Sequence, residues 1–142
     1  MLDRCKRALS HTMPSASAED VLAAGMKLIL ERDAKRKALV VKPRAKTEAD
    51  VRGTEASRYV PAAIRREVWQ RDAGRCQWPL ASGGVCGSEF QAELDHIVPF
   101  GLGGPTTADN LRVLCGPHND AAARLAYGQA YLKPWLSGAD ER

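Results

Sequence analysis

Three cysteines and one histidine in the second half of this 142-residue chain have the side chains and the spacing of a metal site. In Cys115-Gly-Pro-His118 a two-residue spacer lets one turn present both ligands to a tetrahedral ion. Cys76 and Cys86 are separated by nine residues, which is a wider spacing, but Ser82-Gly83-Gly84 can fold that loop back. Three thiolates and one imidazole are a closed ligand set, which favours structural zinc over the alternative of metal-free buried cysteines.

A second group of polar residues lies inside the span of these ligands. Asp95-His96 falls in a strand-like segment, a loop with Gly103-Gly104 follows, and Asn110 and Asn119 come after it. Taken alone, each has a simpler interpretation: Asp95 could cap a turn, His96 could be a core histidine, and Asn110 could be a turn residue. The ordered combination is more specific than any single dipeptide.

Asp-His, the Gly-Gly loop, Asn-Leu and a terminal Cys-x-x-His-Asn together resemble the HNH endonucleases. The resemblance covers about Tyr59 to Gly128 and includes the lead-in Ile64-Arg-Arg-Glu-Val-Trp-Gln-Arg-Asp72. It implies an α+β fold class, a small ββα-metal (HNH) domain with a structural zinc, preceded by a helix and a basic linker. The expected domains are residues 1–57 (helix and linker), 58–136 (nuclease domain) and 137–142 (tail).

The resemblance also implies a role for each polar residue. His96 would be the general base, since an imidazole pKa of about 6.5 lets it take a proton at neutral pH. Asp95, turned to the opposite face from His96, and Asn119 would bind one divalent ion. Asn119 stands where the family name implies histidine, and its oxygen favours Mg²⁺ or Mn²⁺. Asn110 would brace the loop and orient His96.

The distribution of charge favours a nucleic-acid partner. Residues 1–75 hold 17 Lys and Arg against 10 Asp and Glu, whereas residues 76–142 hold 4 against 7. We expect DNA as the partner, with RNA left open, because cations hold phosphates. The residues expected to contact phosphate are Arg65, Arg66, Arg112 and Arg124. The alternative is that these arginines lie on ordinary solvated faces.

No apolar run is long enough for a signal peptide or a membrane span, so we expect a cytoplasmic protein without a membrane partner. In a reducing compartment the clustered cysteines point to a metal rather than to disulfides, and Cys5 is expected to be uninvolved.

The elements that must position these residues can be read from local signals. Ser17 is typical of a helix N-cap, and Lys35–Lys37 suits the end of the same helix. A second helix should open at Pro61-Ala-Ala-Ile64 and stop at Asp72-Ala-Gly74. The remaining expectations are a basic linker at Val40–Ser57, strands at Glu89–Phe100 and Leu111–Leu114, a helix at Asn119–Leu132, and core or zinc-loop packing for Trp69, Trp78 and Trp135.

These observations favour a metal-dependent DNA endonuclease. The alternative from another class is a non-catalytic zinc-stabilised nucleic-acid-binding module, which has no reason to combine Asp95-His96 with Asn119. A zinc deaminase fits less well, because it needs a His-x-Glu and here Ile97-Val98 follow His96.

Overall fold

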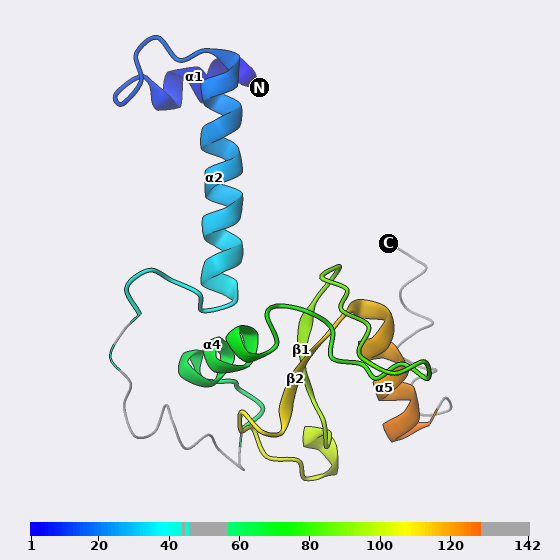
Figure 1. The fold of residues 1–142 in the computed structure, drawn as a ribbon. Helices are drawn as coiled ribbons and strands as arrows, with labels where there is room; N and C mark the ends of the chain where they lie inside the picture. Colours follow the sequence, from blue (N-terminus) through cyan, green and yellow to red (C-terminus); the bar gives the residue numbers. More distant parts are fainter. Residues whose placement is uncertain (44, 46–56, 129–142) are drawn as a thin grey trace. The chain divides into compact units, whose positions relative to one another are not determined.

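The structure, a computed structural model, describes residues 1–43, 45 and 57–128. The chain divides into two compact units, Met1–Pro43 and Arg44–Arg142 (Figure 1). The predicted domain boundaries at residues 57 and 136 stay predictions. Most of the predicted linker, the tail and Trp135 lie outside the described residues. Among the described helices, none is long and apolar enough to cross a membrane.

The first unit consists of α1 (Leu2–Leu9) and α2 (Ala18–Arg36). The predicted N-cap is confirmed: the Ser17 hydroxyl accepts from the Asp20 backbone N–H, and the Asp20 carboxylate accepts from the Ser17 N–H. This reciprocal capping satisfies two donors that a helix start leaves open. The helix α1 was not predicted. No residue of either helix is buried.

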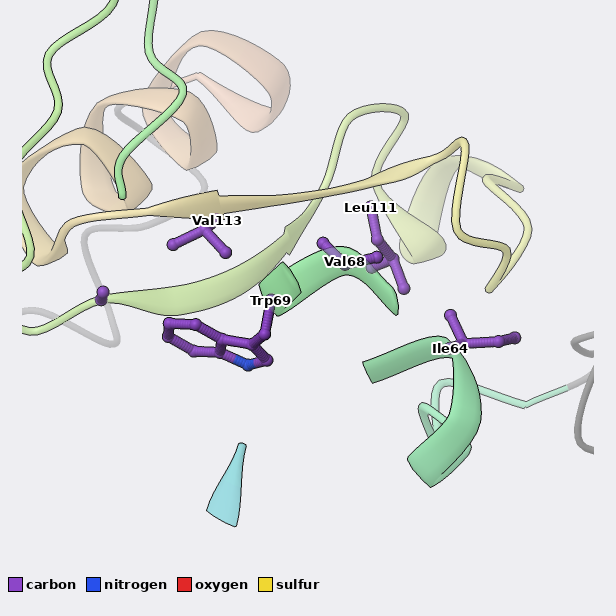
Figure 2. Packing of buried hydrophobic residues seen from close by; sticks show 6 residues of the cluster. Ile64, Val68, Trp69, Leu111 and Val113 are labelled. Carbon is purple, nitrogen blue, oxygen red and sulfur yellow. The ribbon is translucent and has the colours of Figure 1, made fainter. Parts of the chain in front are cut away.

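In the second unit, α4 (Ala62–Arg71) supplies one side of the core. Its side chains Ile64, Val68 and Trp69 are buried against Leu111 and Val113 (Figure 2). Both predicted limits of this helix are confirmed, because Pro61 is the N-cap and the backbone turns left-handed after Asp72.

The strands β1 (Glu93–His96) and β2 (Leu111–Leu114) form a two-stranded antiparallel sheet. The prediction for β2 is confirmed, but the predicted strand Glu89–Phe100 was wrong at both ends. Gln91 has a left-handed backbone with φ of 47°, which interrupts an extended chain before β1. After β1 the chain passes through Pro99 into a 3-10 turn at Phe100–Leu102.

The helix α5 (Gly116–Tyr127) follows β2 directly and completes a ββα arrangement. It begins at Gly116 rather than at the predicted Asn119, because Cys115 is the N-cap and proline is tolerated in the first turn. The predicted end at Leu132 lies outside the described residues.

The register of the sheet separates two sets of side chains. Leu94 pairs with Val113, and both pack in the core cluster that α4 supplies. Asp95 pairs with Arg112, one residue along each strand. Since successive side chains point to opposite faces of a strand, Asp95 and Arg112 lie on the face away from α4.

The outer edge of β2 is bound by the chain that follows α4. The Asp72 carboxylate, which is buried, accepts from the Val113 N–H at 2.8 Å. The Val113 carbonyl accepts from the Gln77 N–H at 2.8 Å, and the Leu111 carbonyl accepts from the Arg71 guanidinium at 2.6 Å. Arg71 also contacts Asp72 at 2.7 Å. The segment 71–77 therefore takes the place of a third strand.

Replacing Asp72 with Ala should destabilise the second unit, because it leaves the buried Val113 N–H without its acceptor and the Arg71 guanidinium without its carboxylate partner. We expect the free energy of unfolding to fall by about 2–4 kcal/mol. Urea unfolding followed by circular dichroism measures the loss. The control is Glu89→Ala, which breaks only an exposed pair with Arg75 and should cost less than about 1 kcal/mol. Equal losses in the two variants would contradict the role given to Asp72.

Candidate active site

The four predicted metal ligands converge at one point of the second unit. Cys76 and Cys86 come from the loop after α4, and Cys115 and His118 come from the junction of β2 and α5. All four ligand atoms lie within 4.8 Å of one another. The Nδ1 atom of His118 is 3.4 Å from the Sγ of Cys76 and 3.3 Å from the Sγ of Cys115.

These distances suit a shared ion. With ordinary zinc–sulfur and zinc–nitrogen bond lengths, a tetrahedral ion holds sulfur and nitrogen ligands about 3.6 Å apart. Cys76 and Cys115 are buried, and Cys86 and His118 are partly buried. Three sulfurs and one imidazole nitrogen in this arrangement can bind a metal ion. Cys5 belongs to α1 of the first unit and is not one of these four ligands.

The wide spacing between Cys76 and Cys86 is closed by a small antiparallel ribbon. The Cys86 N–H donates to the Trp78 carbonyl and the Gly87 N–H donates to the Cys76 carbonyl, each at 2.9 Å. At the tip of the loop Gly83 and Gly84 have φ of 91° and 76°, which only glycine adopts readily. The predicted folding back of this loop is confirmed.

Trp78 joins the metal-ligand cluster to the face of the sheet that carries Asp95. Its ring stacks on His118, with centroids 5.1 Å apart and planes inclined by 4°. The Arg112 guanidinium lies 5.7 Å from the centre of the Trp78 ring. The predicted roles of two tryptophans are thereby confirmed, since Trp69 is in the core and Trp78 packs on the cluster.

Asp95 is held by its cross-strand neighbour. The Arg112 Nε donates to the Asp95 Oδ2 at 3.0 Å, and the two side chains are only 20% and 16% exposed. Burial raises the pKa of the Asp95 carboxyl, while the hydrogen bond and the charge of Arg112 act in the opposite direction. Oδ2 of Asp95 is thus bound by Arg112, and a hydrogen bond from the His96 backbone N–H also acts to lower the pKa of this carboxyl.

His96 is fixed by a hydroxyl that the sequence did not single out. The His96 Nε2 lies 3.0 Å from the Oγ1 of Thr106, and that hydroxyl donates to the Ser57 carbonyl at 2.8 Å. Because its only hydrogen is used on Ser57, the hydroxyl accepts from His96, so Nε2 carries the imidazole proton. The lone pair of the neutral ring is then on Nδ1. Burial lowers the pKa of His96, which favours the neutral ring.

Asn110 braces the loop that carries Thr106. Its side-chain oxygen accepts from the Val98 N–H at 2.9 Å, and its amide nitrogen donates to the carbonyls of Val98 and Pro105 at 3.0 and 2.8 Å. Gly104 lies so close that a Cβ there would be 1.8 Å from the Val98 oxygen. Asn110 therefore holds the loop, and Thr106 in that loop contacts the imidazole of His96.

Asn119 lies in the first turns of α5, on the side that faces β1. Its amide nitrogen is 3.5 Å from the Oε2 of Glu93, and its backbone N–H donates to the Cys115 carbonyl. With the nitrogen turned to Glu93, the amide oxygen is available to another group.

A cleft of about 1070 Å³ brings several of these residues together. Asp95, His96, Asn119 and Arg112 line it, and α5 contributes small side chains such as Ala122. Of the four arginines predicted to contact phosphate, only Arg112 lines the cleft. Arg124 pairs with Asp120 at 2.7 Å, Arg65 donates to the Val60 carbonyl, and Arg66 lies on α4.

The structure adds residues that sequence reasoning missed. Glu93 and Arg58 line the cleft, and Thr106 contacts His96. Glu93 lies two positions before Asp95 and so shares its face of the strand, a periodicity that could have identified it. No spacing in the sequence marks Arg58 or Thr106.

Comparison with known proteins agrees with the resemblance found in the motifs. Residues 83–121 match the HNH endonuclease family, which confirms the HNH assignment for this segment and supports a nuclease-type function. The small α+β fold is likewise confirmed. No protein of curated function matches the chain.

A solved structure of a Type IV phosphorothioation-dependent restriction endonuclease, ScoMcrA, is similar at 25% identity with a TM-score of 0.36. The similarity covers 72% of this chain and 19% of that chain.

Replacing Cys86 with Ser should remove the bound metal and unfold the second unit, because metal-binding energy in so small a core is folding energy. Elemental analysis should find one ion per wild-type chain and much less in the variant, and circular dichroism should show the loss of structure. Cys5→Ser is the matched control and should keep both the ion and the fold. A wild-type preparation that is fully folded without metal would refute this expectation.

Proposed function

We propose that this chain is a metal-dependent endonuclease that hydrolyses phosphodiester bonds in DNA. The observation that carries the proposal is the meeting of Asp95, His96 and Asn119 in one cleft. All three residues fall within the segment that matches the HNH endonuclease family. Hydrolysis of a phosphodiester with the help of a metal ion requires a general base and oxygen ligands for the ion, and this cleft holds one such base and two such ligands.

His96 is the proposed general base, and Nδ1 is the atom that takes the proton. Thr106 keeps the proton of the neutral ring on Nε2, so Nδ1 can accept a proton from a water molecule in the cleft. The deprotonated water oxygen attacks phosphorus, and the bond to the leaving oxygen breaks. The lowered pKa of His96 keeps the base unprotonated at neutral pH.

Asp95 and Asn119 are the proposed ligands of a catalytic divalent ion, Mg²⁺ or Mn²⁺. The donor set fits such an ion, because carboxylate and amide oxygens are the hard ligands that these cations prefer, and both residues line one cleft. When bound, the ion neutralises charge on the phosphate and on the leaving oxygen. Arg112 fixes the orientation of Asp95. The cluster of Cys76, Cys86, Cys115 and His118 is the proposed zinc site, and its role is structural.

DNA is the proposed substrate because the residues before Cys76 carry a net positive charge. Arg65, Arg66 and Arg124 remain candidates for contacts to phosphates outside the cleft. The phosphates there position the duplex without specifying its sequence.

His96→Ala should stop cleavage and leave folding, metal content and DNA affinity intact, because a general base acts in the reaction rather than in binding. The expected loss of rate is about 10²–10⁴-fold. Purified protein is incubated with supercoiled plasmid and Mg²⁺, Mn²⁺ or EDTA, and nicked and linear products are followed on a gel.

Asp95→Ala and Asn119→Ala should also inactivate, but through loss of the ion, so raised Mn²⁺ should restore part of their activity and none of the activity of His96→Ala. Asn119→His, which introduces the ligand that the family name implies, should stay active. If the wild-type protein binds DNA but does not cut it, whichever divalent ion is added, the proposal fails. The non-catalytic binding module then takes its place.

Thr106→Val should slow cleavage by about 10- to 100-fold, because the isosteric side chain no longer fixes the tautomer and orientation of His96. Thr106→Ser keeps the hydroxyl but loses a buried methyl group, so it should lower stability while retaining most of the rate. Cleavage rates and urea midpoints are measured for both variants. If the rates follow the stabilities, Thr106 is only a packing residue.

A further inference from the structure

Arg58 is a cation that lines the cleft without belonging to the motif that matches the family. It lies before α4, outside residues 83–121, yet it borders the same cleft as Asp95, His96 and Asn119. The other arginine of this cleft, Arg112, is already paired with Asp95. In residues 57–128, the Arg58 side chain has no hydrogen-bond or ion-pair partner, and the residue is exposed.

The backbone on both sides of Arg58 is anchored to the site. On one side, the Ser57 carbonyl accepts from the Thr106 hydroxyl, the same hydroxyl that contacts His96. On the other side, Val60 packs against the core cluster and its carbonyl accepts from Arg65. One hydroxyl therefore ties the base to the chain that carries Arg58. These hydrogen bonds hold the backbone of Arg58 near His96, while the exposed Arg58 side chain can reach a ligand in the cleft.

Among the described residues that line the cleft, Arg58 and Arg112 are the only cations, and Arg112 is paired with Asp95. Glu93 and Asp95 on β1 are acidic, and α5 lines the cleft with alanines rather than with basic side chains. Arg58 and His96 line the same cleft, so the charge of the guanidinium acts where the proposed base lies. A group that carries a second negative charge during attack would meet this same positive field.

We propose that Arg58 binds the phosphate that is to be cut and stabilises the charge that develops on it. An arginine suits the task, since its planar guanidinium donates two parallel hydrogen bonds to phosphate oxygens and stays charged at every working pH. This inference rests on the proposed function, because it names a residue for the substrate of the same reaction.

The test separates chemistry from binding. Single-turnover cleavage of a DNA duplex at saturating protein gives the rate. Fluorescence anisotropy of the same duplex, with the zinc-loaded protein and no added Mg²⁺ or Mn²⁺, gives the affinity and its salt dependence. Arg58→Ala should lower the saturating rate by about 10²–10³-fold. Its affinity should fall modestly, with the salt slope reduced by about one unit. Arg58→Lys should lie between Ala and wild type.

Arg75→Ala is the matched control. It removes the same charge from the same unit, but Arg75 pairs with Glu89 on an exposed surface and does not line the cleft. Its saturating rate should equal that of wild type. Circular dichroism and metal content of every variant establish that the fold is kept.

Three results would overturn the inference. Arg58→Ala that cuts as fast as Arg75→Ala shows that Arg58 does not assist the reaction. Arg58→Ala with weakened affinity and an unchanged saturating rate makes it a DNA-positioning residue only. If the wild-type protein fails to cut DNA with every divalent ion tested, the proposed function is overturned, and the inference falls with it. The first two results leave the proposed function standing.

Discussion

The second unit depends on how the outer edge of β2 is satisfied. A sheet of two short strands is marginal by itself and leaves one edge of each strand without partners. Here Arg71, the last residue of α4, and the segment after it provide partners for the edge of β2. Asp72 accepts from Val113, Gln77 donates to Val113, and Arg71 donates to Leu111. The same contacts fix α4 against β2, so the core and the sheet form together. The ends of β2 then fix both chemical sites: Leu111 pairs with His96, and Cys115 follows Leu114 into the metal-ligand cluster.

The metal-ligand cluster and the cleft are connected by a series of side-chain contacts. His118 binds in the cluster and stacks on Trp78, Trp78 lies under Arg112, and Arg112 holds Asp95. Each member of this series is partly buried and in contact with the next, so an ion at the cluster would order the carboxylate at the cleft without touching it. This arrangement explains why a protein with so small a core could keep a precise site: the free energy of metal binding would be spent on the residues that position Asp95.

Local signals predicted more of this structure than long-range ones could. The Ser17 cap, the limits of α4 and the strand β2 were predicted because their causes lie within a few residues. The length of β1 and the start of α5 were misjudged, since they depend on Gln91, Asn110 and Cys115 in their folded setting. The metal ligands and the Asp-His pair could be found from residue type and spacing. Thr106 could not, because its contact with Ser57 joins residues 49 positions apart, and Arg58 could not, because only the cleft reveals its place.

The uneven charge of the sequence acquires a physical meaning in the cleft. Residues 76–142 supply the proposed base, the proposed oxygen ligands and the cysteines of the metal-ligand cluster, and they are net acidic. A polyanion would be repelled by Glu93 and Asp95 until a divalent ion had neutralised them. Cations that do not depend on the ion must therefore come from elsewhere in the chain, and Arg58, contributed by the basic half, borders the same cleft. In the proposed reaction, substrate attraction and ion binding thus fall to different parts of the sequence, so the phosphate and the ion would not compete for the same side chains.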